Sequence, residues 1–245
     1  MRIIRAFKTL YAHYWKIIPT FLIVFVLTHY ISNLIPIIGM AFLLPLKVSV
    51  FYTMLIVTTK PKKHFIIPIH IGFKKDVYLK NVFYLSIQQI LYLAPILIGT
   101  LISAWIYQHT DINLPLEILI VNLIVFAIPT AIMSLTLSMV PFLLADPKFN
   151  QAKKNPLKES AHLLKGSYIK LLLMRLIFIP WFVWFSSGFI VTLLSTYNIT
   201  FGQGESIFPW LSISWLISIP VKLLLIDPLY QLMHADLYVS LKKRS

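Results

Sequence analysis

Three charged residues lie within stretches of the sequence that are otherwise apolar: Lys47, Lys222 and Asp227. A charge at the centre of a membrane-spanning helix costs about 3 kcal/mol or more, so such residues usually face a partner or a water-filled cavity. The three residues are therefore a candidate polar pocket for an ion, a proton or a lipid headgroup. On a regular helix Lys222 and Asp227 are about 140° apart and poorly placed to pair. Lys222 could then meet an acceptor on another span, and Asp227 could meet Lys47.

A structural interpretation of the same charges is the one we favour. Asp227 precedes Pro228 and would begin a turn there, while the Lys47 side chain would extend along apolar surface to the phosphate layer. Prolines this close to the charges indicate broken, partly hydrated helices. In this interpretation the three charges have no binding function.

No set of residues in the sequence resembles a catalytic or metal site. The chain has eight acidic residues and no cysteine, so disulfides and thiolate metal ligands are excluded. Its seven histidines show no metal-binding spacing, and neither a Gly-x-Ser-x-Gly turn nor a Walker loop is present. We therefore predict no catalytic residue, no metal and no cofactor, and we predict that the protein is not an enzyme. An intramembrane lipid enzyme is the least supported alternative.

A tyrosine and, two residues later, a lysine stand at the start of three apolar stretches: Tyr14 and Lys16, Tyr78 and Lys80, Tyr168 and Lys170. Tyrosine rings sit at the depth of lipid headgroups, and lysine ammonium groups lie among the phosphates. We predict that these pairs, together with Lys165, contact headgroups at the membrane surface. Asp146 and Asp236 end apolar stretches beside clustered lysines, and we expect them to form interfacial salt bridges or helix caps.

The two Ala-Asp pairs, Ala145-Asp146 and Ala235-Asp236, lie 90 residues apart. Tyr78 and Tyr168 keep the same separation of 90 residues, which suggests that two segments of the chain are copies of one hairpin. The alternative is that tyrosine and lysine are simply attracted to any inner membrane interface. The sequence leaves a repeat and a chance match open.

The composition is that of an integral membrane protein. Hydrophobic residues make up 58% of the 245 residues and charged residues only 12%, which leaves too little polar surface for a soluble domain of this size. The net charge is +14, but residues 17–46, 81–147 and 176–221 contain no Lys or Arg. Cytoplasmic loops keep these residues, and translocated loops lose them. The charge thus indicates membrane topology, and nucleic acid is not a predicted partner.

We predict an all-α fold, a single transmembrane domain over residues 1–245 with six membrane-spanning helices. The helices form three hairpins, at 17–59, 82–145 and 167–233, because each contains two apolar segments long enough to span a bilayer. Lys and Arg cluster before, between and after these hairpins. This distribution places both termini in the cytoplasm.

The segments outside the hairpins are predicted to lie at the inner membrane surface. Residues 1–16 place apolar side chains on one helical face, which is typical of a helix lying in the interface. The basic loop 60–81 is expected to be cytoplasmic, with a second short interfacial helix at 71–80. Residues 234–245 are expected to form a cytoplasmic tail.

The cytoplasmic segment 146–166 contains the signals of a helix start and a helix end. Asn155 is the predicted cap, Pro156 stands in the first turn, and Gly166 stops the helix. We expect this helix to lie on the membrane or against another loop.

One group of residues between 145 and 240 carries a resemblance to a known family. The matching residues are Asp146, Ser160, Leu163, Leu164, Lys165, Gly166, Lys170, Phe178, Ile179 and Trp181, with a looser match at Pro228-Leu229-Tyr230 and Leu237-Tyr238. In these positions the chain resembles the bacterial membrane proteins of domain-of-unknown-function family 975. The resemblance implies six spans in a bacterial plasma membrane, and it implies no activity.

Two functions follow from these features. The first is a non-enzymatic accessory or immunity-type factor that binds another membrane protein, a peptide or anionic lipid through its basic inner face. The alternative is a transporter or permease subunit, in which Lys47, Lys222 and Asp227 line a path and the basic loops contact an ATPase partner.

Overall fold

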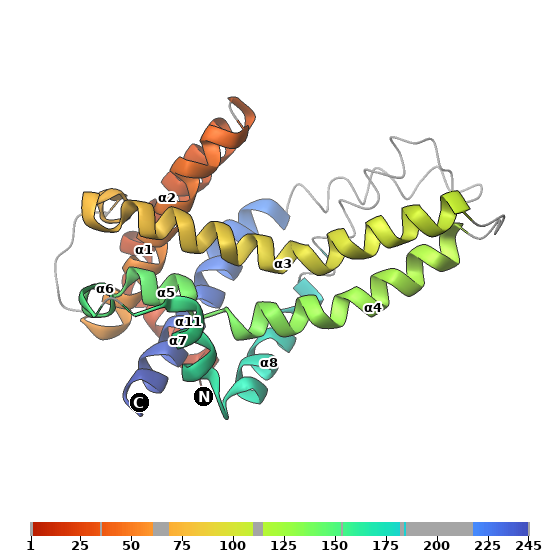
Figure 1. The fold of residues 1–245 in the computed structure, drawn as a ribbon. Helices are drawn as coiled ribbons and strands as arrows, with labels where there is room; N and C mark the ends of the chain where they lie inside the picture. The colour runs from red at the N-terminus through yellow and green to blue at the C-terminus, as the bar shows by residue number, and fades with distance from the viewer. Residues whose placement is uncertain are drawn as a thin grey trace, which may run out of the picture.

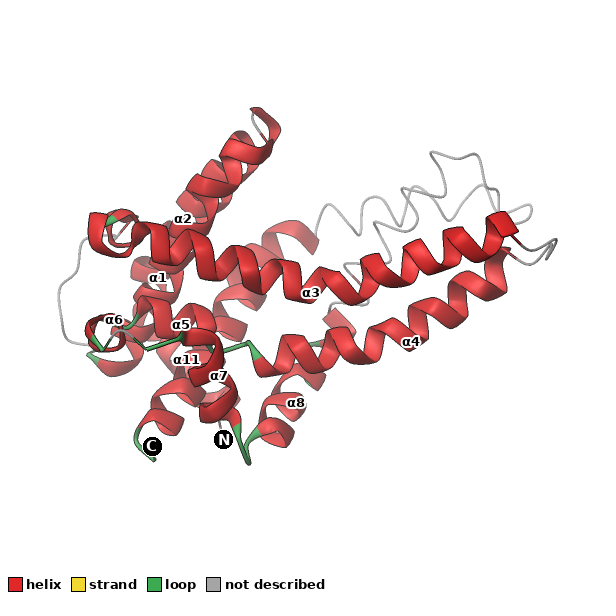
Figure 2. Cartoon of the chain, in the orientation of Figure 1, coloured by secondary structure: helices red, strands yellow, loops and turns green. Residues whose placement is uncertain are grey.

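The structure, a computed structural model, describes residues 2–34, 36–60, 69–109, 115–152, 154–181, 184 and 218–244. These residues form helices joined by turns, with no strand among them (Figure 2). Within this part of the chain, four segments are long and apolar enough to cross a membrane: Ile3–Leu27, Phe42–Thr59, Lys75–Ile102 and Ile128–Ala145. The all-α class is thus confirmed, and the four segments agree with a membrane protein. Six spans and cytoplasmic termini stay predictions, because much of the predicted hairpin at 167–233 lies outside the described residues.

Two long helical pairs extend from a common cluster of shorter helices (Figure 1). One pair consists of α1 (Arg2–Leu34) and α2 (Pro36–Thr59), and the other of α3 (Lys75–His109) and α4 (Pro115–Thr136). The cluster contains α5 (Val140–Ala145), α6 (Pro147–Gln151), α7 (Pro156–Leu164) and α11 (Asp227–Lys242). The helix α8 (Tyr168–Leu176) lies against α4.

The first half of α1 is amphipathic, and its apolar face packs against the rest of the protein. The helix bends at His13, whose φ and ψ angles of −125° and 19° are not helical, so the bend lies close to the predicted boundary at residue 16. Before the bend, Ala6 and Leu10 are buried, and α1 contacts α11. Phe7, by contrast, is exposed. Contact of this segment with the membrane surface stays a prediction.

The prediction of a separate interfacial helix at 71–80 is wrong. Residues Ile69–Phe73 form a short 3₁₀ helix, and α3 then begins at Lys75 and continues without a break to His109. The 3₁₀ helix is held between α2 and α3. A Cβ atom on Gly72 would lie 1.9 Å from the Pro45 carbonyl oxygen, and the Asn81 side chain donates a hydrogen bond to the Gly72 carbonyl at 3.1 Å. These contacts fix residues 69–73 to the protein core.

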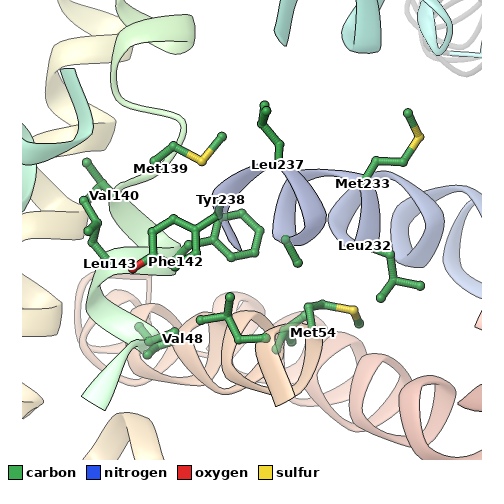
Figure 3. Close-up of a cluster of buried hydrophobic side chains, with 14 of the residues drawn as sticks. Val48, Met54, Met139, Val140, Phe142, Leu143, Leu232, Met233, Leu237 and Tyr238 are labelled. Atoms are coloured by element: carbon green, nitrogen blue, oxygen red, sulfur yellow. The ribbon is translucent and has the colours of Figure 1, made fainter. Parts of the chain in front are cut away.

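A buried cluster lies where α11 packs on α2 beside α5 (Figure 3). The ring of Phe142 stacks on that of Tyr238 with centroids 5.9 Å apart and meets Phe51 edge-on at 4.9 Å. Around these rings lie Met139 of the turn before α5 and aliphatic and methionine side chains of the three helices, among them Val48, Met54, Val140, Leu143, Leu232, Met233 and Leu237. Residues 234–242, predicted as the start of a tail, are therefore the second half of a packed helix.

The helix signals in the segment 146–166 are confirmed. The Asn155 side chain accepts a hydrogen bond from the Leu157 N–H at 2.9 Å, and Pro156 occupies the first turn of α7. Gly166 has a φ angle of +77°, which favours glycine and ends the helix. Two residues on α7, Leu163 and Leu164, are buried, and α7 packs against α5.

Candidate functional site

The second half of the predicted hairpin at 82–145 is interrupted by a turn. The helix α4 ends at Thr136, residues 137–139 form a turn, and α5 begins at Val140. Pro141 follows immediately and has no N–H for a regular helical bond to Leu137. This part of the hairpin is therefore not one regular α-helix, although Ile128–Ala145 together are long and apolar enough to cross a membrane.

Side chains from two other helices form hydrogen bonds with backbone groups at this turn. The Ser160 hydroxyl on α7 donates to the Thr136 carbonyl at 2.7 Å and accepts from the Met139 N–H at 3.2 Å. Gln88 on α3 donates to the Leu137 carbonyl at 2.8 Å. Irregular backbone at membrane depth is tolerated only where such partners are supplied. These hydrogen bonds connect the turn between α4 and α5 to α3 and α7.

A cavity of about 370 Å³ lies beside this turn. It is lined by residues of α2, α3, the 137–139 turn, α5, α8 and α11, and its polar lining consists of Lys47, Gln88, Gln89, Tyr92, Ser138, Arg175, Tyr230, Gln231 and His234. Of the lining residues Lys47 alone is exposed, while His234 is 3% exposed. Below, we call this space the polar cavity.

Arg175 on α8 connects the polar cavity to the end of α4. Its guanidinium group donates to the Ser134 hydroxyl at 2.6 Å and to the Ser134 carbonyl at 2.8 Å. The same side chain also lies near Tyr230 of α11. From the distribution of Lys and Arg, Arg175 is predicted only to lie near the start of a membrane span. Its hydrogen bonds to Ser134 were not predicted. Its position among the apolar residues 171–181 was the available signal.

The structure brings two of the three predicted pocket residues together. The Lys222 ammonium lies 2.9 Å from the Asp227 carboxylate, and each side chain is about one-quarter exposed, at 27% and 26%. The prediction that these two residues are poorly placed to pair is wrong. Residues Lys222–Ile226 form a π-helical turn, in which the Asp227 N–H bonds to the Lys222 carbonyl. Five residues then make about one turn, so the two side chains meet on one face.

Lys47 lies elsewhere. It lines the polar cavity, whose described lining includes neither Lys222 nor Asp227. Within the described part of the chain, no carboxylate lies within ion-pair distance of the Lys47 ammonium.

The two aspartates that end apolar stretches form ion pairs, and one of them is also a cap. Asp146 accepts from the Lys148 N–H at 3.0 Å at the start of α6, and it pairs with Lys242 near the end of α11. Asp236 accepts from the Arg5 guanidinium of α1 at 3.1 Å. Both aspartates thus connect α11 to helices far away in the sequence.

A second, more basic hollow lies at the end of α2 opposite its connection to α1. Its volume is about 530 Å³, and it is lined by four lysines: Lys60, Lys148, Lys242 and Lys243. Apolar and aromatic side chains of α2 and α11 form its walls, among them Tyr52, Leu55, Ile56 and Val239. Asp146 and Tyr238 also line it. Below, we call it the basic groove.

The three Tyr-x-Lys pairs have different surroundings. The Tyr14 ring meets the exposed Trp15 edge-on, and Lys16 is half-buried. Tyr78 stacks on Phe73, with ring centroids 6.1 Å apart.

The other members of these pairs lie along α3 and α7–α8. Lys80 lies over the Phe149 ring, with its ammonium 5.2 Å from the ring centroid. Tyr168 donates a hydrogen bond to the Ala161 carbonyl at 3.4 Å, and Lys165 and Lys170 are exposed. Headgroup contact by these residues stays a prediction.

No three His, Asp or Glu side chains come together as metal ligands within the described residues. Comparison with protein-family models, with curated proteins and with solved structures gives no match for this chain. The resemblance to domain-of-unknown-function family 975 therefore stays a prediction from the motif residues. One of those residues has a defined structural role, because Ser160 satisfies the backbone of the 137–139 turn.

Proposed function

We propose that this chain is a non-enzymatic, multi-pass protein of a bacterial plasma membrane that binds anionic lipid at its cytoplasmic face. Six spans and cytoplasmic termini are part of this proposal, on the basis of the distribution of Lys and Arg. The observation that carries it is the basic groove. Four lysines surround a hollow whose walls are apolar, which is the complement of a phosphate headgroup attached to an acyl chain.

The charges of the basic groove favour an anion strongly. Lys242 is paired with Asp146, but Lys60, Lys148 and Lys243 have no ion-pair partner among the described residues. Each lysine near an anionic membrane surface contributes about 1 kcal/mol to binding. Three such lysines around one hollow therefore favour phosphatidylglycerol over a zwitterionic lipid.

The test is lipid binding by the purified chain. The protein is placed in phosphatidylcholine nanodiscs, phosphatidylglycerol is titrated in, and bound lipid is counted by native mass spectrometry. The variant Lys60→Gln with Lys243→Gln should weaken the apparent affinity for phosphatidylglycerol about thirtyfold, because it removes two of these contributions. The charge-matched control is Lys8→Gln with Lys158→Gln, two exposed lysines outside the groove. Equal losses in both variants would mean that only overall charge matters, and the groove would be rejected as the site.

A second candidate function is transport, with the chain as a permease subunit. The polar cavity favours it, because Lys47 and Arg175 supply charge among apolar segments of α2 and α8. Purification from native membranes separates the two candidates: a stoichiometric ATPase partner supports a permease, and a protein recovered with lipid alone supports the lipid-binding role.

A further inference from the structure

Three polar atoms of residues that line the polar cavity are buried and have no hydrogen-bond partner among the described residues. They are Nε2 of His234, Oγ of Ser138 and Nε of Arg175. A buried polar group without a partner costs about 1–3 kcal/mol, and a bound water, ion or ligand is one way to remove that cost. Three of them around one cavity point to a ligand that supplies several hydrogen bonds at once.

The charge of the lining restricts the ligand to an anion. Lys47 and Arg175 are the ionised groups of the described lining, and no Asp or Glu is among them. The remaining polar members are neutral amides, hydroxyls and an imidazole. Two cations facing one space of this size attract an anionic group and disfavour a cation.

The hydrogen bonding of His234 restricts the ligand further. Its Nδ1 lies 2.9 Å from the Tyr230 carbonyl oxygen, which can only accept, so Nδ1 carries a proton. In the neutral ring Nε2 then has a lone pair and accepts a hydrogen bond. A carboxylate has no proton to donate to it. A phosphate monoanion has both a P–OH donor and anionic oxygens, and a glycerol-phosphate headgroup has hydroxyl donors beside its phosphate.

We propose that the polar cavity binds a phosphate group that carries a hydroxyl donor. In this site Lys47 and the Arg175 guanidinium contact the anionic oxygens, Ser138 donates a hydrogen bond, and His234 Nε2 accepts from the hydroxyl. The source of the group is either free phosphate or the headgroup of phosphatidylglycerol. The space suffices, since 370 Å³ is many times the roughly 30 Å³ that one water molecule occupies. The site shares no residue with the basic groove, so it does not depend on the function proposed above.

The experiment uses the full chain in phosphatidylcholine nanodiscs and two probes. Inorganic phosphate is titrated at pH 6, where the monoanion predominates, and binding is followed by isothermal titration calorimetry. Phosphatidylglycerol is titrated separately and counted by native mass spectrometry. The variants are Lys47→Gln and Ser138→Ala, with Lys170→Gln as the control because it removes an exposed lysine outside the cavity.

We expect Lys47→Gln to weaken binding of one probe by about tenfold or more, since it removes a hydrogen bond to a charged group. Ser138→Ala should weaken the same probe by about threefold to tenfold, and Lys170→Gln should leave it unchanged. An effect on inorganic phosphate identifies free phosphate as the source, and an effect on phosphatidylglycerol alone identifies the lipid. If neither probe binds, or if Lys47→Gln and Ser138→Ala bind both probes like the control, the proposal is overturned. Loss of phosphatidylglycerol binding only in the Lys60 and Lys243 variant, with phosphate binding unchanged in Lys47→Gln and Ser138→Ala, would support the basic groove and reject this site.

Discussion

The Asp146 carboxylate accepts a hydrogen bond from the Tyr238 hydroxyl at 2.8 Å, although 92 residues separate them in the chain. Burial, and then the neighbouring Asp146 carboxylate, raise the pKa of Tyr238 above its ordinary value. A raised pKa means that the hydroxyl keeps its proton at physiological pH and remains a donor. This bond and the Lys242 ion pair join the end of α5 to the last turns of α11.

The first prediction concerns this bond. Tyr238→Phe keeps the ring that stacks on Phe142 and removes only the hydroxyl. We expect a loss of about 1.5–3 kcal/mol in the free energy of unfolding, because the hydrogen bond has a charged acceptor. Thermal unfolding in detergent measures it. The control is Tyr52→Phe, a half-buried tyrosine of the same groove with no hydrogen bond to a described residue, for which we expect a change below about 0.5 kcal/mol. Equal changes in the two variants would contradict the role assigned to the bond.

The second prediction tests the 137–139 turn. Ser160→Ala leaves the Thr136 carbonyl and the Met139 N–H without the partner that serves both. Each unsatisfied buried group costs about 1–3 kcal/mol, so we expect a loss of about 2 kcal/mol or more. Ser167→Ala is the matched control, because Ser167 is buried but its hydroxyl makes no hydrogen bond with a described residue. A mild effect of Ser160→Ala, similar to that of the control, would show that the turn is satisfied in another way.

The third prediction concerns the ion pair in the π-helical turn. Removing one partner, in Lys222→Met or Asp227→Asn, should destabilise the protein more than removing both, because an unpaired buried charge is the costly state. A double-mutant cycle on thermal stability should give a coupling of more than about 0.5 kcal/mol, which is the usual error of additivity. The same cycle with Lys47 in place of Lys222 should give no coupling with Asp227. The reverse pattern would mean that Lys47 is the partner in the membrane.

The fourth prediction uses the close approach of Gly72 to α2. In Gly72→Ala the new Cβ would lie 1.9 Å from the Pro45 carbonyl oxygen, which is a backbone atom and cannot rotate away. We expect a loss of about 1–3 kcal/mol or more, as for other overpacked sites. His70→Ala, at an exposed position of the same 3₁₀ helix, should be close to neutral. If Gly72→Ala unfolds at the same temperature as His70→Ala, the 3₁₀ helix does not pack on Pro45.

The fifth prediction tests the topology in cells. Single cysteines at Asn113 and Gln203 should react with a membrane-impermeant maleimide added outside, and cysteines at Lys62 and Lys154 should not. Asn113, Gln203 and Lys62 lie outside the described residues, so the prediction rests on the distribution of Lys and Arg. Labelling of Lys62→Cys in intact cells would refute the proposed orientation, because the surrounding loop is one of the basic segments.

Local signals in the sequence predicted the start and the end of α7 well. The effects of the Asn155 cap, of Pro156 and of Gly166 depend only on residues next to them in the sequence. The start and the end of the helix could therefore be predicted from a few residues. The sequence predicted that Asp146 and Asp236 form ion pairs, because carboxylates beside clustered bases commonly do so. Their partners could not be named, since Lys242 and Arg5 are brought near only by the packing of α11.

The sequence predicted less of the candidate site. The break after Thr136 lies within an apolar run, where the sequence gives little sign of it. Ser160 and Gln88, which form hydrogen bonds with the backbone at the break, lie on other helices. Pro141 was the available signal, but prolines also occur inside continuous helices of this protein, such as Pro95 in α3. The Lys222–Asp227 pair was missed because regular helical spacing was assumed, whereas the turn is π-helical.

The π-helical turn also sets the phase of the helix that follows it. A turn with one extra residue rotates all later positions by about 100° relative to an uninterrupted α-helix. The extra residue therefore sets the direction of Tyr230, which lies near Arg175, and of Tyr238, which meets Asp146. Deleting one of Leu223, Leu224 or Leu225 would restore a regular helix and keep its apolar character, but it would turn these two side chains away from Arg175 and Asp146. The orientation of α11 thus depends on the number of leucines in this turn rather than on their chemistry.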